Sequence, residues 1–531
     1  MSGEFATDST SVYLVGGGIA SLAAAAFLIR DGNIPGRNIT ILEASPKIGG
    51  SLDAGNSRDG YVMRGGRMFE SKYVCTFDLF SSIPTLDEGK TVTQEIFQWN
   101  EVMKTSSQSR LFREGHRVDA PKFGLTQRHI LTLERIALQP EEALGSSSIG
   151  DQFDPSFFET DFWILWCTTF AFQPWHSAAE FKRYLNRFTH MISGFNRLKG
   201  IMRTVYNQYD SLVRPLEKWL LGRGVEFRFN TCVLDLEFHD SFDGYWVRRI
   251  HCRRDGGEYD VEVSERDLAI VTLGSMVEGS SLGSTDSAPE IRSKSQDGGW
   301  RLWERLAVGN HQFGCPDVFA EHVEQSKWVS FTTTLYDPTL FQLIADRTGN
   351  VPGEGGLITF PESRWLASIV LPHQPHFIGQ PPDVHVLWGY GLSVDVEGNF
   401  VDKPMQDCTG RDIMTEILGH LRVEDQAKMI LDSCICNPCR MPYITSQFSC
   451  RSKGDRPDVV PPGSKNLAFI GQFCELPEDV VFTVEYSIRS AQTAVYSLLN
   501  LDRTPPPVYR GQDRLRVLLQ AVETLHDRQH A

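Results

Sequence analysis

The chain has 531 residues and a formal net charge of −15 at pH 7, and 41% of its residues are hydrophobic. This length allows one large domain or several ordinary ones, and the apolar content is enough for a sizeable folded core. The acidic balance argues against nucleic acid as a partner, because phosphate binding needs clustered Lys and Arg side chains.

The cysteines predict a reduced, cytoplasmic protein without a metal site. Eleven cysteines are scattered without a regular framework, and no secretory leader with a basic start is evident. Cys434, Cys436 and Cys439 lie close together, but a zinc site would need a second Cys or His pair at a defined spacing. We therefore expect buried thiols here and no bound metal.

Residues 1–10 are expected to form a disordered arm, and the apolar run "SVYLVGGGIASLAAAAFLI" follows it. The run is long enough to imitate a membrane span, but three consecutive glycines interrupt it. A buried strand, a glycine turn and a buried alanine-rich helix ending near Gly32 fit better. The segment "NITILEAS" then predicts a second strand that ends in Glu43.

This order of strand, turn, helix and strand is that of a dinucleotide-binding unit. Glycines let backbone amides approach a pyrophosphate, and an acid after the second strand can accept a hydrogen bond from a ribose hydroxyl. The small Ser21 stands where the fingerprint has its third glycine. The later pair Gly49 and Gly50 is typical of flavin enzymes, and the strand "LAFIG" with the helix after it is expected to return to this domain. Two distant segments at one site favour FAD over NAD.

The residues expected at the cofactor come from these segments and from two strands between them. They are Gly16, Gly17, Gly18, Ala20, Ser21, Glu43, Ala44, Gly50, Ser51, Val233, Thr272, Gly471, Phe482 and Thr483.

The stretch "YVMRGGRMFESKY" is the second motif with chemical potential. Arg64 and Arg67 flank Gly65 and Gly66, and Met68 and Glu70 follow. From the residues alone this is a loop that holds an anion, a catalytic loop or only a tight turn.

Along the chain we predict a discontinuous FAD-binding domain, substrate-binding regions and a helical tail. The FAD domain is expected in residues 11–135, 210–290 and 455–500, and the tail in 501–531. Residues 136–209, mostly helical, and 291–454, β-rich, are expected to bind the substrate. The tail repeats apolar residues at helical spacing, so its helix either docks on the body or lies on a membrane surface; these residues are Leu515, Leu518, Leu519, Val522 and Leu525.

Over almost its whole length the chain resembles the oleate hydratases, FAD-dependent fatty acid hydratases once called myosin-cross-reactive antigens. The resemblance is carried by "YVMRGGRMFESKYVCTFDLFSSIP", "FFETDFWILWCTTFAFQPWHSAAEFKRYLNRF", "YNQYDSLVRPLEKWL", "WGYGLSVDVEGNFVDKPMQDCTG" and "LAFIGQFCELPEDVVFTVEYS". It implies an α/β protein with a Rossmann-like FAD-binding domain. It also implies addition of water across the cis double bond of an unsaturated fatty acid, from oleic acid to 10-hydroxystearic acid, without net redox chemistry.

Hydration of an isolated alkene needs an acid for one carbon and a means of aiming water at the other. The resemblance assigns the acid to Tyr184. It places a water-activating glutamate at the position that holds Met68 here, and a thioether cannot accept a proton. The resemblance still implies that the loop binds the cofactor, embracing the isoalloxazine through Arg64, Gly65, Gly66 and Arg67 with Met68 beside them. Glu70, another carboxylate, or the backbone and flavin alone remain as substitutes, and Glu70 can equally pair with a neighbouring cation.

The resemblance also implies where the substrate carboxylate binds. It assigns this role to Gln208, to His376 and to a Thr and an Asn whose positions hold Val370 and Pro372 here. Two polar partners are therefore missing, and His373 is an alternative polar group beside them.

The glycine motif begins within the first twenty residues, whereas many family members carry a longer arm and form dimers. We therefore expect a monomer or a weak homodimer in the cytoplasm, with the tail helix as the one segment suited to peripheral membrane contact. Two other functions stay open from the sequence: an FAD-dependent oxidoreductase of the amine oxidase type, and a fatty-acid-binding flavoprotein without catalysis.

Overall fold

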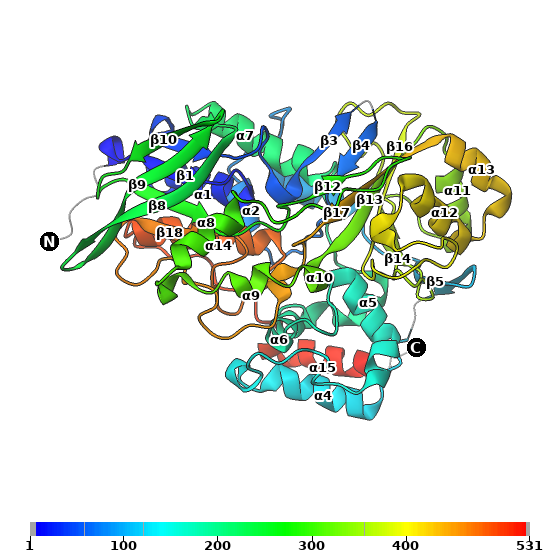
Figure 1. Ribbon diagram of the computed structural model, residues 1–531. Helices are drawn as coiled ribbons and strands as arrows, with labels where there is room; N and C mark the ends of the chain where they lie inside the picture. The colour runs from blue at the N-terminus through cyan, green and yellow to red at the C-terminus, as the bar shows by residue number, and fades with distance from the viewer. Residues whose placement is uncertain (1–6, 58, 120–121, 355, 527–531) are drawn as a thin grey trace.

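The computed structural model describes residues 7–57, 59–119, 122–354 and 356–526. Most of the arm expected in residues 1–10 lies outside this range, and Thr7–Ser9 form a short 3₁₀ turn. Figure 1 shows two β-rich bodies side by side and a helical layer below them.

A five-stranded parallel sheet forms the first body. Its strand order is β18-β11-β1-β2-β7, with bounds Leu467–Ile470, Leu268–Thr272, Val12–Val15, Ile39–Leu42 and Glu226–Arg228. The sequence therefore placed the first two strands and the late strand correctly. Parallel pairing in this order leaves the carboxyl ends of β1, β2, β11 and β18 at one edge, where ligands bind in open α/β sheets.

Two helices from opposite ends of the chain pack together beside this sheet. Helix α1 (Ile19–Arg30) is buried over most of its length, and α14 (Val484–Leu498) contacts it. The run of alanines in α1 allows this close approach, because small side chains leave little space between backbones. Helices α2 (Val74–Phe80) and α7 (Arg214–Leu221) also contact α1. The expected return of the late helix to the first domain is confirmed.

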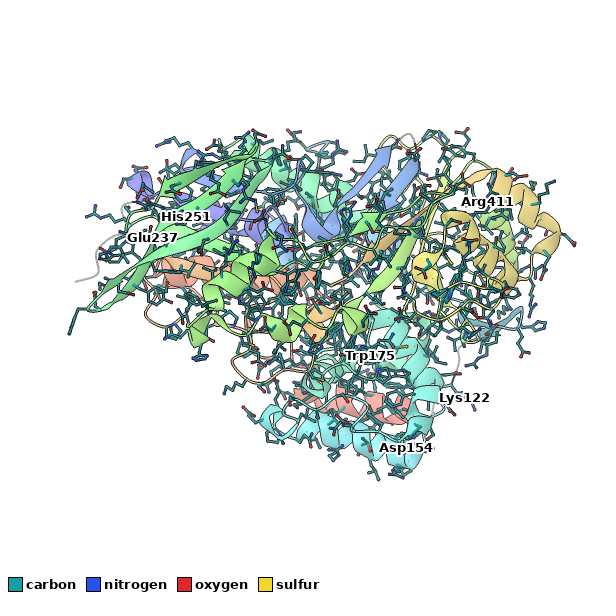
Figure 2. All side chains as sticks on the ribbon, in the orientation of Figure 1. Lys122, Asp154, Trp175, Glu237, His251 and Arg411 are labelled. Atoms are coloured by element: carbon teal, nitrogen blue, oxygen red, sulfur yellow. The ribbon has the colours of Figure 1, made fainter. Side chains whose placement is uncertain are left out.

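A three-stranded antiparallel sheet extends the first body. Its strands are β8 (Thr231–Ser241), β9 (Gly244–Arg254) and β10 (Gly257–Glu262). Charged side chains such as Glu237 and His251 lie on this sheet (Figure 2) and form ion pairs with neighbouring strands. Helix α8 (Gly299–Ala307) contacts β8.

An eight-stranded mixed sheet forms the second body. Its order is β12-β17-β13-β16-β15-β14-β5-β6, with bounds Ser281–Leu282, Cys434–Met441, Trp328–Leu335, His385–Gly391, Ser368–Val370, Leu357–Thr359, Ser109–Arg113 and His116–Asp119. The hairpin of β3 (Ala54–Ser57) and β4 (Gly60–Met63) contacts β13. The three clustered cysteines lie on β17 as buried free thiols, as expected.

Helices α11 (Thr339–Thr348), α12 (Gly410–Leu421) and α13 (Glu424–Asp432) share a second hydrophobic core with this sheet. Strands β5 and β6 differ from the predicted division, because they fall within residues 11–135 but belong to the sheet of the second body, where β5 pairs with β14 and β6 pairs with β5. The remaining helices of the two bodies are α3 (Val92–Val102), α9 (Asp317–Ala320) and α10 (Val323–Ser326).

The helical layer contains α4 (Gln127–Leu138), α5 (Asp161–Phe170), α6 (Ala178–Arg187) and the 3₁₀ segment η6 (Thr189–Arg197). The tail helix α15 (Leu515–Leu525) packs on η6, so the tail docks on the body. Its buried residues are Ala521, Thr524 and Leu525, whereas Leu515, Leu518 and Leu519 of the predicted stripe are exposed. Within the described part of the chain, every helix is too short or too polar to cross a bilayer.

Candidate cofactor and active site

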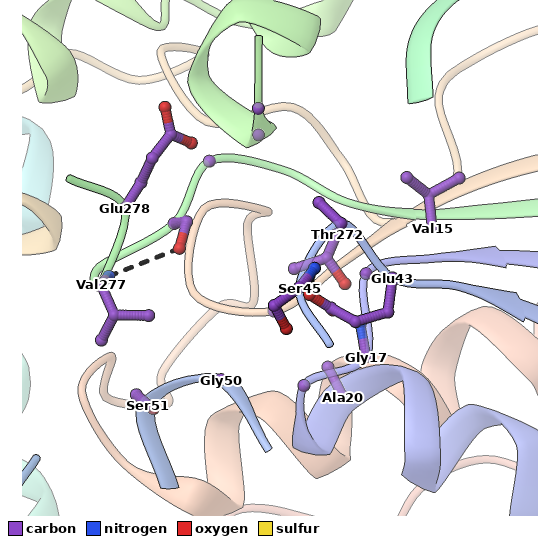
Figure 3. A pocket seen from close by; sticks show the side chains of 18 of the residues that line it. Val15, Gly17, Ala20, Glu43, Ser45, Gly50, Ser51, Thr272, Val277 and Glu278 are labelled. Atoms are coloured by element: carbon purple, nitrogen blue, oxygen red, sulfur yellow. Dashed lines mark hydrogen bonds between the residues drawn. The ribbon is translucent and has the colours of Figure 1, made fainter. Parts of the chain in front are cut away.

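A cavity of about 690 Å³ opens at the carboxyl edge of the parallel sheet (Figure 3). It lies between the ends of β1, β2 and β11, the start of α1, and the segment after β18. Most residues expected at the cofactor line it: Gly16, Gly17, Gly18, Ala20, Glu43, Ala44, Gly50, Ser51, Arg64, Val233, Thr272 and Gly471. The βαβ pattern in the sequence thus identified the walls of one cavity.

The glycine turn is shaped to receive an anion. Gly16 has a φ of +91°, in the region that favours glycine, and a Cβ on Gly17 would lie 2.9 Å from Oε2 of Glu43. Gly18 caps α1 without a side-chain hydrogen bond, so the first amides of the helix are not covered by a capping side chain. A helix N-terminus of this kind attracts negative charge.

Glu43 is held at the cavity by backbone donors. Its Oε2 accepts from the amide of Gly17 at 2.5 Å, and its Oε1 accepts from the amide of Ser45 at 2.7 Å. Figure 3 shows this carboxylate between the glycine turn and Ser45. A carboxylate has further lone pairs, so Glu43 can still accept from a ligand hydroxyl.

Ser21 lies behind the cavity wall. It is fully buried, and its Oγ is 3.2 Å from Oγ1 of Thr272, which links α1 to β11. A small side chain at this position permits close packing of helix and strand, and its hydroxyl finds a partner there.

The Arg-Gly-Gly-Arg loop follows β4 and joins two cavities. Arg64 lines the large cavity and lies 3.6 Å from Asp53. Gly66 and Arg67 line a second, smaller cavity of about 30 Å³. Gln208 fixes the loop there, since its Oε1 accepts from the amide of Arg67 at 3.2 Å and its Nε2 donates to the carbonyl of Arg67 at 3.0 Å.

Four other residues expected at the cofactor do not line the large cavity: Gly65, Met68, Phe482 and Thr483. Met68 is partly buried against the core. The guanidinium of Arg67 lies over the ring of Phe482 at 4.9 Å, and Thr483 caps α14 by accepting from Tyr486. Phe482 and Thr483 therefore support the loop and the late helix.

Tyr184 lies on α6 in an aromatic surrounding formed by Phe170, Phe172 and Phe448. It is 1% exposed, and its hydroxyl donates to the carbonyl of Val481 at 2.6 Å. Burial raises the pKa of Tyr184 well above its usual value, while the charge of Arg67 acts in the opposite direction. The phenol is therefore protonated, and a cation near it can stabilise the phenolate left after proton transfer.

Glu70 lies in a buried ionic cluster rather than in either cavity. It is 2% exposed, and its carboxylate pairs with Nη1 of Arg187 at 2.7 Å and accepts from the amide of Lys72 at 2.7 Å. Burial alone would raise the pKa of Glu70, but the hydrogen bond from His190 and the charge of Arg187 hold that pKa below its ordinary value. Of the two roles expected for Glu70, this geometry shows the pairing with a cation, which is Arg187.

The small cavity gathers the residues expected at the substrate carboxylate: Gln208, Val370, Pro372 and His376, with His373 beside them. Burial, together with the charges of Arg203 and His373, lowers the pKa of His376 to about 3, so its ring is neutral. Sequence reasoning missed Arg203 and Trp388, which also line this cavity. For Arg203, the sequence offered one indication, since this arginine lies a few residues before Gln208 in "IMRTVYNQYDS".

Comparison with known proteins places this geometry in context. A model of the MCRA family matches residues 9–496. The chain is 40% identical to an oleate hydratase of Streptococcus pyogenes serotype M49 (strain NZ131), over 98% of this chain and 90% of the relative. It is 33% identical to a linoleate hydratase of Lactiplantibacillus plantarum, over 99% of this chain and 100% of the relative.

Solved structures share the fold at low identity. A variant of putrescine oxidase aligns with a TM-score of 0.53 and 11% identity, over 92% of this chain and 98% of that chain. Cyclohexylamine oxidase from Brevibacterium oxydans aligns with a TM-score of 0.51 and 12% identity, over 93% of this chain and 100% of that chain. These likenesses concern the Rossmann-like architecture alone.

Proposed function

The chain belongs to the MCRA family, and from this premise we propose that it is an FAD-dependent fatty acid hydratase. The observation that carries the proposal is identity of 40% and 33%, along nearly the whole chain, to relatives named oleate hydratase and linoleate hydratase. The substrate class is an unsaturated fatty acid with a cis double bond, and oleic acid would yield 10-hydroxystearic acid.

The large cavity fits FAD. Its glycine turn and the uncapped start of α1 suit a pyrophosphate, and the carboxylate of Glu43 suits ribose hydroxyls. The volume of about 690 Å³ is that of a site for a large organic ligand. Arg64 and the loop after it lie on the way from this cavity to the small one. When bound, FAD would supply a planar polar ring that shapes the reaction site.

Tyr184 is the proton donor in this proposal. Its phenolic proton goes to one alkene carbon, and the oxygen of water forms a bond to the other. The second proton of that water returns to the phenolate, so the reaction consumes one alkene and one water and yields one alcohol. Arg67 supports this role, because a buried positive charge near the phenol stabilises the phenolate. To deliver the proton, the hydroxyl must leave the carbonyl of Val481.

Water is oriented without a carboxylate at position 68 in this proposal. Met68 cannot accept a proton, and Glu70 can act as a base only if it leaves Arg187. We favour orientation by the backbone of Gly65, Gly66 and Arg67, which Gln208 holds in place. Glu70 then positions this loop through its ion pair, and the role of Glu70 as base is the competing hypothesis.

The test is incubation of the purified protein and FAD with oleic acid in water labelled with heavy oxygen, followed by mass spectrometry. Labelled 10-hydroxystearic acid is expected, and Tyr184→Phe is expected to lose at least about 100-fold of the rate. Tyr336→Phe is a matched control, since Tyr336 is 53% exposed. Oxygen consumption without alcohol would instead identify an oxidoreductase. Bound fatty acid with neither product would identify a binding protein without catalysis.

The partners follow from the same assignment. We expect a monomer or weak homodimer in the cytoplasm, and a stable dimer mass in light scattering would contradict this.

Helix α15 presents Leu515, Leu518 and Leu519 to solvent beside the docked face, which suits contact with a lipid surface. Wild-type protein should sediment with phospholipid vesicles, and Leu518→Ser with Leu519→Ser should not.

A further inference from the structure

The small cavity contains more positive charge than its protein neighbours neutralise. Arg67 and Arg203 both line it, and none of the ion pairs in the described residues involves either side chain. Burial lowers the pKa of each guanidinium to about 10, and no neighbouring carboxylate contributes to raising it. A buried cation without a counter-ion is costly, so such a site favours an anionic ligand.

The two arginines have different surroundings. The charge of Arg67 acts on Tyr184, the proposed proton donor, and the guanidinium of Arg67 stacks on Phe482. Arg203 lines the same small cavity beside His376, and its charge acts on that imidazole. Arg203 is therefore the cation suited to a carboxylate at this cavity, because it adjoins the histidine that the resemblance assigns to the carboxylate.

Unused hydrogen-bond donors and acceptors surround Arg203. Its Nε is buried and has no partner, and the same holds for Nδ1 of His376 and Nε1 of Trp388. His376 is only 8% exposed, and its backbone is fixed by Asn207 and Gln380. Nη2 of Arg67, at the same cavity, is also buried without a partner. Buried polar atoms in native proteins normally have partners, so four unpartnered atoms around one cavity indicate a polar ligand.

Gln208 is already engaged in this geometry. Both ends of its amide bond the backbone of Arg67, and Val370 and Pro372 offer only apolar surface. The groups that the family resemblance assigns to the substrate carboxylate are thus reduced to His376. A carboxylate would need another strong donor, and a guanidinium is the side chain best matched to it.

Arg203 is also held in position. Its amide donates to Oδ1 of Asn100 at 2.9 Å, and Nδ2 of Asn100 donates to its carbonyl at 2.8 Å. A Cβ on Gly356 would lie 3.1 Å from Nη2 of Arg203, so the glycine leaves room for the guanidinium. The backbone of Arg203 is thus fixed and its guanidinium has space beside Gly356, which limits the conformational entropy lost when it binds a ligand.

We propose that Arg203 binds the fatty acid carboxylate by an ion pair, and that this pairing makes the protein select ionised fatty acids over neutral esters. The inference rests on the proposed function for the identity of the ligand. Arg203 would thus replace, as a carboxylate-binding group, the Thr and Asn that the resemblance expects at the positions of Val370 and Pro372.

The test measures binding of oleate and of methyl oleate by titration calorimetry, with the FAD-loaded protein. Wild type is expected to prefer oleate. Arg203→Gln should weaken oleate binding by about ten- to hundred-fold and leave methyl oleate unchanged. Arg203→Lys, which keeps the charge without the planar fork, should recover part of the preference. Arg223→Gln is the control, because Arg223 is exposed and stacks on Trp219.

The ratio of the two affinities does not depend on how much of a variant is folded, which protects the result against partial unfolding. An unchanged ratio in Arg203→Gln would overturn the inference, and so would a wild type that binds neither ligand. Binding that depends on Arg203 without any alcohol product would support it while refuting hydration. Alcohol production with an unchanged affinity ratio in Arg203→Gln would support hydration and refute the role of Arg203.

Discussion

Replacing Glu70 by Gln separates its two candidate roles. The pair of Glu70 and Arg187 is buried, with side chains 2% and 1% exposed, and the substitution removes the negative partner while keeping the shape. Losing one partner of a buried pair costs about 3–5 kcal/mol of folding free energy. Asp479 lies 3.8 Å from Nε of Arg187 and retains part of the attraction, so the lower end, about 3 kcal/mol, is expected.

The assay is urea unfolding followed by tryptophan fluorescence. Glu226→Gln is the control, because its pair with Arg228 is half exposed and should contribute at most about 1 kcal/mol. The folded-state pKa of Glu70 is lowered, so its stabilisation is present above the unfolded-state pKa and is lost as pH falls through the folded value. The difference between wild type and Glu70→Gln should therefore shrink on acidification.

The opposite pattern would refute this reasoning. If Glu70→Gln unfolds at the wild-type urea concentration and yet loses about 100-fold or more of hydration, then Glu70 acts in the chemistry. The buried pair with Arg187 would then be dispensable for the fold, and the carboxylate would have to reach the reaction site.

Three further substitutions test the cavity walls. Gly17→Ala places a Cβ 2.9 Å from Oε2 of Glu43, so flavin retained after gel filtration should fall at least about tenfold. Burial raises the pKa of Glu278 to about 7. Between the ordinary pKa of a glutamate and pH 7, this carboxyl group is therefore protonated more in the folded state than in the unfolded state. Glu278→Gln should therefore stabilise by about 1–2 kcal/mol above pH 7 and change little in acid, measured as urea midpoints. Ser21→Val should cost about 1–3 kcal/mol in the same assay, because it overpacks the contact with Thr272 and leaves that hydroxyl unpaired.

The parallel-sheet half of the molecule was predictable because its signals are local. The strand before Gly16, the alanine-rich helix after Gly18 and the acid that ends the second strand each follow from residues close in sequence. Glycine spacing and helix position determine where an anion can bind, and neither depends on the rest of the fold. The cavity walls found there match the residues expected from the pattern.

The rest depends on partners that are distant in sequence. Strand β5, with β6 beside it, pairs with β14, which lies more than two hundred residues later, and no local pattern selects that neighbour. Glu70 looked available as a base because its partner Arg187 lies on α6. Arg203 resembled any other arginine until the structure placed it beside His376 without a counter-ion. Pairing of charges across a fold is set by tertiary packing, which sequence spacing does not encode.

Strand β18 and helix α14 complete a sheet that begins with β1, and this has a consequence for synthesis of the chain. Residues 467–498 must leave the ribosome before they can reach β11 and α1, which are made much earlier. Until then β11 has an open edge, and the cavity lacks the wall that contains Gly471. Under the proposed function, a nascent chain therefore lacks part of its cofactor site until residues 467–498 are made, and the edge of β11 is open to mispairing until then. Under that proposal, flavin loading follows the synthesis of this segment.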